Sequence, residues 1–180
     1  VIKTGNRVLS EELWNPMKDY LLTMKYFEVK DMEGYETAIW DYMQNHMNLT
    51  NVLNYDLYTQ AIHGIDNAYK NQYIAAVMDE EGSYRLWKSP WDLNYCFGDQ
   101  YDGENDLLTS YFLENHTKIM HRYMLTTYFL EAGYSPAIKV IQERWDYLRD
   151  HVFVEEHVEE LAENFTNELK DSGAFYREYA

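Results

Sequence analysis

Apolar side chains recur every three or four residues over much of this sequence, which is the spacing of one face of an α-helix. The pattern is seen in four stretches: Ile39, Met43 and Met47; Leu53, Leu57 and Ala61; Ile138, Ile141, Trp145 and Leu148; and Val158, Leu161, Phe165 and Leu169. We therefore expect a mainly helical protein, with glutamates of the last stretch on a solvated face.

Helix ends are indicated at two places. Gly133 closes the apolar-rich stretch 107–130, and glycine is common just past a helix end. Ser135 and Pro136 follow, which predicts a new helix with serine as N-cap and proline at its first position. Near the start of the chain, residues 23–29 are compatible with a strand, although their alternation is poor.

One segment departs from the helical spacing. Residues 73–78 (YIAAVM) are short, apolar and partly β-branched, residues 79–82 (DEEG) form a turn, and residues 83–88 (SYRLWK) resume an extended pattern. This predicts a β-hairpin. Pro90 cannot donate to the ladder, so we expect the second strand to end there. The expected fold class is mainly α with a small β-hairpin, in a single domain covering residues 1–180.

Composition narrows the classes of function. The chain has 180 residues, 46% of them hydrophobic, with 15 basic and 31 acidic residues and a formal charge of −16. Such a charge would repel a phosphate backbone, so nucleic acid is not expected as a partner, whereas basic polypeptides and divalent cations are attracted. No apolar run approaches the roughly 18 residues that span a bilayer. Cys96 is the single cysteine, so no internal disulfide can form, and the compartment stays open.

Candidate chemistry flanks the predicted hairpin. Asp66 precedes it, with Asn71 five positions later, and Asp92 follows it in an aromatic-rich segment that ends in Phe97 and Gly98. The order is similar to that of a protein-kinase centre, in which an aspartate accepts the substrate proton while an asparagine and a later aspartate hold metal ions. A hairpin between them would bring both loops to one edge.

The same segments resemble the spore-coat protein H (CotH) kinases, atypical members of the protein-kinase-like fold. The resemblance is carried by residues 84–98 (YRLWKSPWDLNYCFG) and 66–74 (DNAYKNQYI). It implies the C-terminal lobe of a kinase-like fold, with Asp66 as catalytic base and with Asn71 and Asp92 as metal ligands. It also implies Mg²⁺ (or Ca²⁺ or Mn²⁺) and ATP as cofactors, a basic or serine-rich protein as acceptor, and a bacterial spore coat or cell surface as location.

Two features depart from the family. Asn94 stands where the family usually has a second aspartate, and the sequence shows no glycine-rich phosphate loop or Lys–Glu pair. We expect those elements in an N-terminal lobe preceding Val1, and little activity from this chain alone.

Several alternatives stay open at this stage. The chain could be an inactive pseudokinase or a surface-interaction module, or a helical interaction domain without kinase ancestry. Asp66 could cap a turn, Asn71 could be an ordinary strand-edge residue, and Asp92 could belong to a turn. The acidic cluster Asp99, Asp102, Glu104 and Asp106 invites a calcium interpretation, but it lacks the EF-hand pattern and a solvated loop is favoured.

Overall fold

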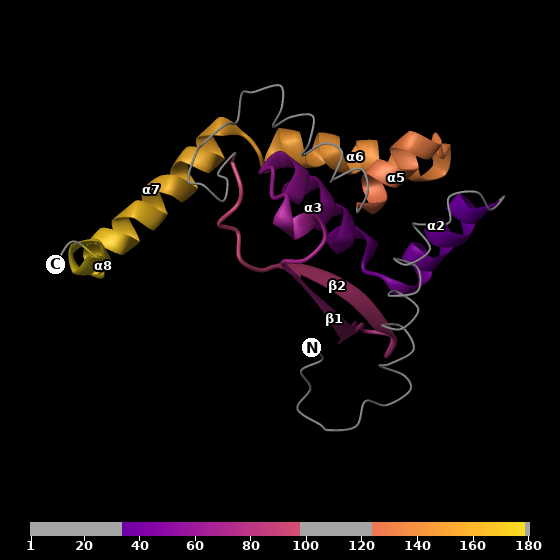
Figure 1. The fold of residues 1–180 in the computed structure, drawn as a ribbon, viewed down its shortest axis with the longest axis horizontal. Helices are drawn as coiled ribbons and strands as arrows, with labels where there is room; N and C mark the ends of the chain where they lie inside the picture. Colours follow the sequence, from indigo (N-terminus) through magenta and orange to yellow (C-terminus); the bar gives the residue numbers. More distant parts are fainter. Residues whose placement is uncertain (1–33, 98–123, 179–180) are drawn as a thin grey trace. The chain divides into compact units, whose positions relative to one another are not determined.

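A computed structural model describes residues 34–97 and 124–178. The chain divides into two units, residues 1–141 and 142–180. The possible strand at 23–29, the acidic cluster at 99–106 and most of the stretch 107–130 lie outside the described residues. The expectation of a mainly helical protein with one small antiparallel hairpin is confirmed (Figure 1).

Two helices of the first unit pack against the hairpin. Helix α2 (Tyr35–His46) buries Ile39, Trp40 and Met43, and helix α3 (Leu49–Ala61) buries Val52, Leu53 and Leu57. Asn48 is the N-cap of α3, since its side chain accepts a hydrogen bond from the backbone N–H of Asn51 at 2.9 Å. The predicted helical stretches at 39–47 and 53–61 therefore correspond to these two helices.

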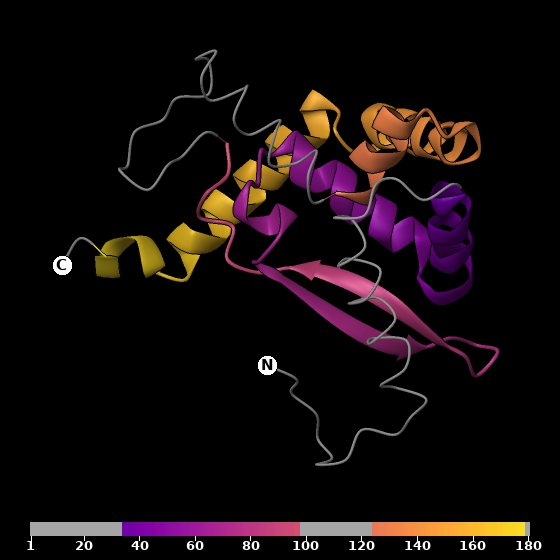
Figure 2. The ribbon, with the colours of Figure 1, turned by 45° about the vertical axis from the view of Figure 1, so that its right-hand side comes forward.

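The hairpin consists of β1 (Gln72–Met78) and β2 (Tyr84–Pro90), paired antiparallel with Gln72 opposite Pro90 and Met78 opposite Tyr84. The second strand ends at Pro90, as expected. Ser83 belongs to the turn rather than to the strand, because its N–H donates to the Asp79 carboxylate at 2.8 Å. Figure 2 shows the turn at one end of the hairpin and, at the other, the chain leading into and out of the two strands. We call this second end, residues 71–72 and 90–92, the open end.

One face of β2 is covered by the helices, and this fixes which side chains point inward. Leu86 and Lys88 are buried, whereas Trp87 between them is 38% exposed, as the two-residue period of a strand requires. The outer edge of β2 is also paired: Asn48 donates its N–H to the Leu86 carbonyl at 2.9 Å. The side chain of Asn51 further binds both the N–H and the carbonyl of Lys88. Strand β2 is thereby held in register against α3.

Helix α5 (Leu125–Ala132) completes the core of the first unit. Phe129 is fully buried and packs edge-to-face on Trp40, with ring centroids 5.4 Å apart. Gly133 ends the helix with a left-handed backbone (φ 67°), as the sequence predicts. Helix α6 (Ser135–His151) begins one residue earlier than predicted, so Ser135 is its first helical residue rather than its cap.

The second unit contains the end of α6, helix α7 (Glu155–Asp171) and the short helix α8 (Ala174–Glu178). Leu148 of α6 is buried, and Trp145 contacts Phe153 with ring centroids 6.0 Å apart. The predicted apolar stripe of α7 is present at helical spacing. Its members Val158, Leu161 and Phe165 are nevertheless 52%, 57% and 63% exposed. Among the described residues, we find no helix with the length and apolar character needed to cross a bilayer.

Candidate functional site

The candidate catalytic residue, Asp66, lies in a short 3₁₀ helix, η1 (Asp66–Ala68), between α3 and β1. Its carboxylate is almost fully buried. The ammonium of Lys70 lies 2.8 Å from one carboxylate oxygen, and the hydroxyl of Tyr69 donates to the other at 3.3 Å. The backbone carbonyl of Asp66 accepts from the N–H groups of Lys70 and Asn71 at 2.9 and 3.1 Å. The turn that carries Asp66 is therefore fixed both by its side chain and by its backbone.

The candidate metal ligands Asn71 and Asp92 meet at the open end of the hairpin. The side-chain amide of Asn71 donates to the backbone carbonyl of Asp92 at 3.4 Å. Next to this contact, the N–H of Trp91 donates to the Asn71 carbonyl at 3.0 Å. Asp92 is exposed, in contrast to the buried Asp66. The structure thus brings the segments 66–71 and 91–92 together, as the order of the motifs predicts.

Left-handed backbone conformations at non-glycine residues occur in the loop before η1 and in the loop after β2. Within the described residues, three non-glycine residues have positive φ: His63 (55°), Asp92 (54°) and Phe97 (54°). Their segments are joined, because the N–H of Phe97 donates to the carbonyl of Ile62 at 2.6 Å. Such conformations cost of order 1–3 kcal/mol each and are found preferentially at functional sites. The loop after β2 is therefore held in an unfavourable conformation by its surroundings.

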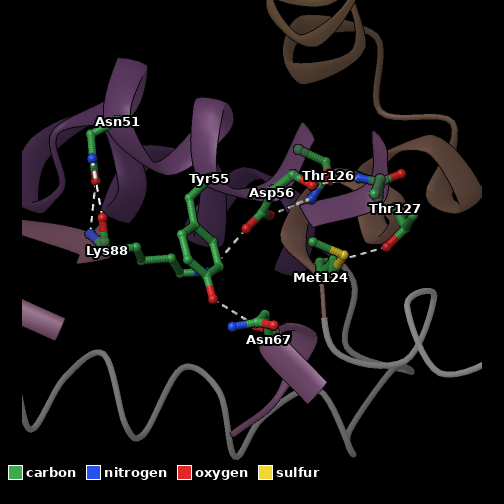
Figure 3. Close-up of polar contacts among 9 residues, drawn as sticks. Asn51, Tyr55, Asp56, Asn67, Lys88, Met124, Thr126 and Thr127 are labelled. Atoms are coloured by element: carbon green, nitrogen blue, oxygen red, sulfur yellow. Dashed lines mark hydrogen bonds and ion pairs between the residues drawn. The ribbon is translucent and has the colours of Figure 1, made fainter. Parts of the chain in front are cut away.

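A second polar cluster lies beneath β2 and contains a buried ion pair (Figure 3). The ammonium of Lys88 lies 3.0 Å from an Asp56 carboxylate oxygen, and the two side chains are only 4% and 1% exposed. Lys88 also lies over the ring of Tyr55, 5.2 Å from its centroid. The other carboxylate oxygen of Asp56 accepts from the backbone N–H of Thr126 at 3.4 Å. This cluster joins α3, β2 and α5.

Several polar residues of these two clusters were assigned no role from the sequence, among them two lysines, an aspartate and an asparagine. Lys70 could have been found, since it stands four positions after Asp66. Lys88 gave a weaker signal, as a lysine at an inward position of the strand pattern beside Leu86. Asp56 gave no signal, because its partner is 32 residues away. Asn67 also gave none, although it is fully buried between the two loops.

The donor set at the open end limits what it can bind. Among the described residues, no group of three or more histidines, cysteines, aspartates or glutamates is placed to hold a metal ion. Asn71 and Asp92 offer one amide and one carboxylate, which is a partial site. Mg²⁺ fits such a site, because it is commonly bound by one or two protein oxygens together with substrate phosphates and water.

Comparisons of the chain with protein-family models, with curated proteins and with solved structures found no significant match.

Proposed function

We propose that this chain is the C-terminal lobe of an atypical, Mg²⁺- and ATP-dependent Ser/Thr protein kinase of the CotH type. The reaction would be transfer of the γ-phosphoryl group of ATP to a hydroxyl group of a protein acceptor. The observation that carries the proposal is the meeting of two short segments at the open end of the hairpin. One contains Asp66 and Asn71, the other contains Asp92, and hydrogen bonds join them directly.

Asp92 and Asn71 are the residues that would hold the cation. Asp92 is exposed just after β2, and its backbone is in the left-handed region (φ 54°). The side-chain amide of Asn71 donates to the backbone carbonyl of Asp92, so the two proposed ligands belong to adjoining segments. When bound, a divalent cation there would neutralise phosphate charge. Two protein ligands leave positions for phosphate oxygens, as expected for Mg²⁺ rather than for a structural metal.

Asp66 would act as the proton acceptor. In this proposal its carboxylate takes the proton of the acceptor hydroxyl, whose oxygen bonds to the γ-phosphorus while the bond from that phosphorus to the β,γ-bridging oxygen breaks. Lys70, 2.8 Å from Asp66 and 44% exposed, is the counter-charge of the buried carboxylate. Its ammonium would also stabilise negative charge on the transferred group.

The acceptor would be a basic or serine-rich polypeptide. The formal charge of −16 attracts cationic partners and repels anionic ones. This electrostatic attraction increases the rate at which the two proteins meet, and it weakens as the ionic strength rises. Transfer to a basic acceptor should therefore slow as salt is raised.

The test is phosphoryl transfer by the full-length gene product, compared with nucleotide binding in the same preparations. Asp66→Asn keeps the shape but cannot take a proton, so transfer should fall by about 10²–10⁴ while Mg²⁺·ATP still binds. Asp92→Ala removes a cation ligand, so transfer should fall by about 10²–10³ and Mg²⁺-dependent ATP binding should weaken as well. Calorimetry measures the binding, and radiolabel transfer measures the rate.

Asp79→Ala is the matched control, because Asp79 lies at the turn, the opposite end of the same hairpin. Its transfer rate should equal that of the parent. If Asp66→Asn and Asp92→Ala also transfer and bind like the parent, the kinase assignment is wrong. If the parent binds nucleotide but never transfers phosphate, the alternative of a pseudokinase or interaction module is favoured.

A further inference from the structure

The side chain of Asn67 lies between the two loops of the candidate site and is completely buried. Its amide nitrogen donates two hydrogen bonds, one to the Asn71 carbonyl at 2.7 Å and one to the Trp91 carbonyl at 2.8 Å. The first acceptor belongs to a proposed cation ligand itself, and the second to the residue immediately before the other ligand, Asp92. A single carboxamide therefore fixes both ligand-bearing segments.

Asn67 is itself held rigidly by the core of the first unit. Its backbone carbonyl accepts from the hydroxyl of Tyr55 on α3 at 2.7 Å, within a buried contact (Figure 3). Its backbone N–H donates to the carbonyl of Gly64 at 3.0 Å. The first bond joins the 3₁₀ turn to α3, and the second joins it to the loop that follows α3. The carboxamide thus reaches the loops from a fixed base.

The oxygen of the same carboxamide differs from the nitrogen in its contacts. The Oδ1 atom of Asn67 is buried and has no hydrogen-bond partner among the described residues. A buried acceptor without a partner costs about 1–3 kcal/mol. The hydrogen bonds that this side chain makes come from its two N–H groups alone, and both are directed at the ligand-bearing loops.

We propose that Asn67 is a positioning residue, which sets the separation of Asn71 and Asp92 before a divalent cation binds. The inference rests on the proposed function, because it concerns the two ligands of that site. Without the two N–H groups, the carbonyls of residues 71 and 91 lose their common donor and the ligands must be brought together when the cation binds. Residues that orient metal ligands typically change metal affinity or activity by about 10–100-fold when they are replaced.

The experiment compares Asn67→Ala with Asn51→Ala in the full-length gene product. Asn51 is the matched control, because its carboxamide also binds backbone groups of the hairpin, at 3.2 and 2.7 Å, but at Lys88 rather than at the ligands. The affinity for Mn²⁺ in the presence of ATP is measured from the electron paramagnetic resonance signal of free Mn²⁺. The midpoint of urea unfolding is measured without cation. Both variants should be less stable than the parent.

Asn67→Ala should weaken Mn²⁺ binding by about 10–100-fold, whereas Asn51→Ala should leave it within about two-fold of the parent. If Asn67→Ala does not fold, Asn67→Ser replaces it, since a hydroxyl can restore one of the two donors, and an intermediate loss of affinity is expected. Equal effects of Asn67→Ala and Asn51→Ala would overturn the inference, because a general loss of stability would then explain both.

Asp92→Ala separates failure of the inference from failure of the proposed function. If Asp92→Ala loses Mn²⁺ binding while Asn67→Ala or Asn67→Ser retains parental affinity, the cation site stands and the positioning role is wrong. If Asp92→Ala binds Mn²⁺ like the parent, the proposed site is wrong, and the positioning role is wrong with it.

Discussion

Replacing Asp56 by asparagine removes the carboxylate that pairs with the Lys88 ammonium in the core of the first unit. The asparagine keeps the size of the aspartate and one oxygen that can accept from the N–H of Thr126, but an amide nitrogen, which only donates, then replaces the oxygen that faces Lys88. The parent pair is 3.0 Å apart and its side chains are 4% and 1% exposed, so water cannot replace the lost carboxylate without rearrangement.

The expected loss of stability follows from two opposing contributions, the attraction between the charges and the cost of burying them. Two unit charges 3.0 Å apart attract by about 5.5 kcal/mol at an effective dielectric constant of about 20, while burial of both charges costs several kcal/mol. Breaking such a pair by removing one partner typically costs about 3–5 kcal/mol, because the remaining charge stays buried. Against a total free energy of unfolding of about 5–15 kcal/mol, this is a severe loss. Asp56→Asn and Lys88→Met should each show it.

The double variant Asp56→Asn/Lys88→Met contains no buried charge at this place. Its stability should therefore be equal to or higher than that of either single variant, which is the signature of a coupled pair in a double-mutant cycle. Urea unfolding, followed by tryptophan fluorescence and by circular dichroism at 222 nm, measures all four proteins. The exposed pair Asp146–Arg149, 3.4 Å apart, is the control, and Asp146→Asn should cost about 0–1 kcal/mol.

Additive effects of the two single variants would refute this reasoning. So would a cost below about 1 kcal/mol for Asp56→Asn, which is the range of a surface ion pair. Strand β2 leads directly from Lys88 to Asp92, so the pair also anchors the strand that delivers a proposed cation ligand.

Two further predictions concern pH. Burial, together with the neighbouring Glu36, raises the pKa of the Tyr128 hydroxyl to about 12, so its stabilising contribution is complete below pH 10 and is lost as the pH rises through about 12. Absorbance titration at 295 nm should show a late-ionising component that Tyr128→Phe reduces; an unchanged titration curve would contradict the assignment. Hydrogen bonds, chiefly from the N–H of Ser83, lower the pKa of Asp79 below its usual value. The stabilisation of the hairpin by the Asp79 carboxylate is therefore present above pH 4 and is lost at lower pH. The difference in the free energy of unfolding between the parent and Asp79→Ala should shrink as the pH falls below 4. A difference that does not depend on pH would show that the charge has no role.

Local patterns in the sequence were sufficient to predict where several helices and the hairpin lie. Helical spacing located α2 and α3, Gly133 marked the end of α5, and the turn residues 79–82 with Pro90 located the hairpin. These features depend on neighbours within a few residues, so the sequence encodes them directly. The order Asp66, Asn71, hairpin, Asp92 also predicted which loops come together, because a hairpin necessarily returns its second strand to the start of the first.

Tertiary structure decided what those residues contact. Lys88 stands at an inward strand position, and only the packing of α3 against β2 pairs it with Asp56. Asn67 appeared as an ordinary loop residue, yet its carboxamide joins carbonyl groups on both sides of the hairpin. The stripe of α7 shows the limit of periodicity, since Val158 and Phe165 have helical spacing but are exposed within the described residues. Spacing determines which face of a helix a side chain lies on, whereas burial depends on what packs against that face, often from a distant part of the chain.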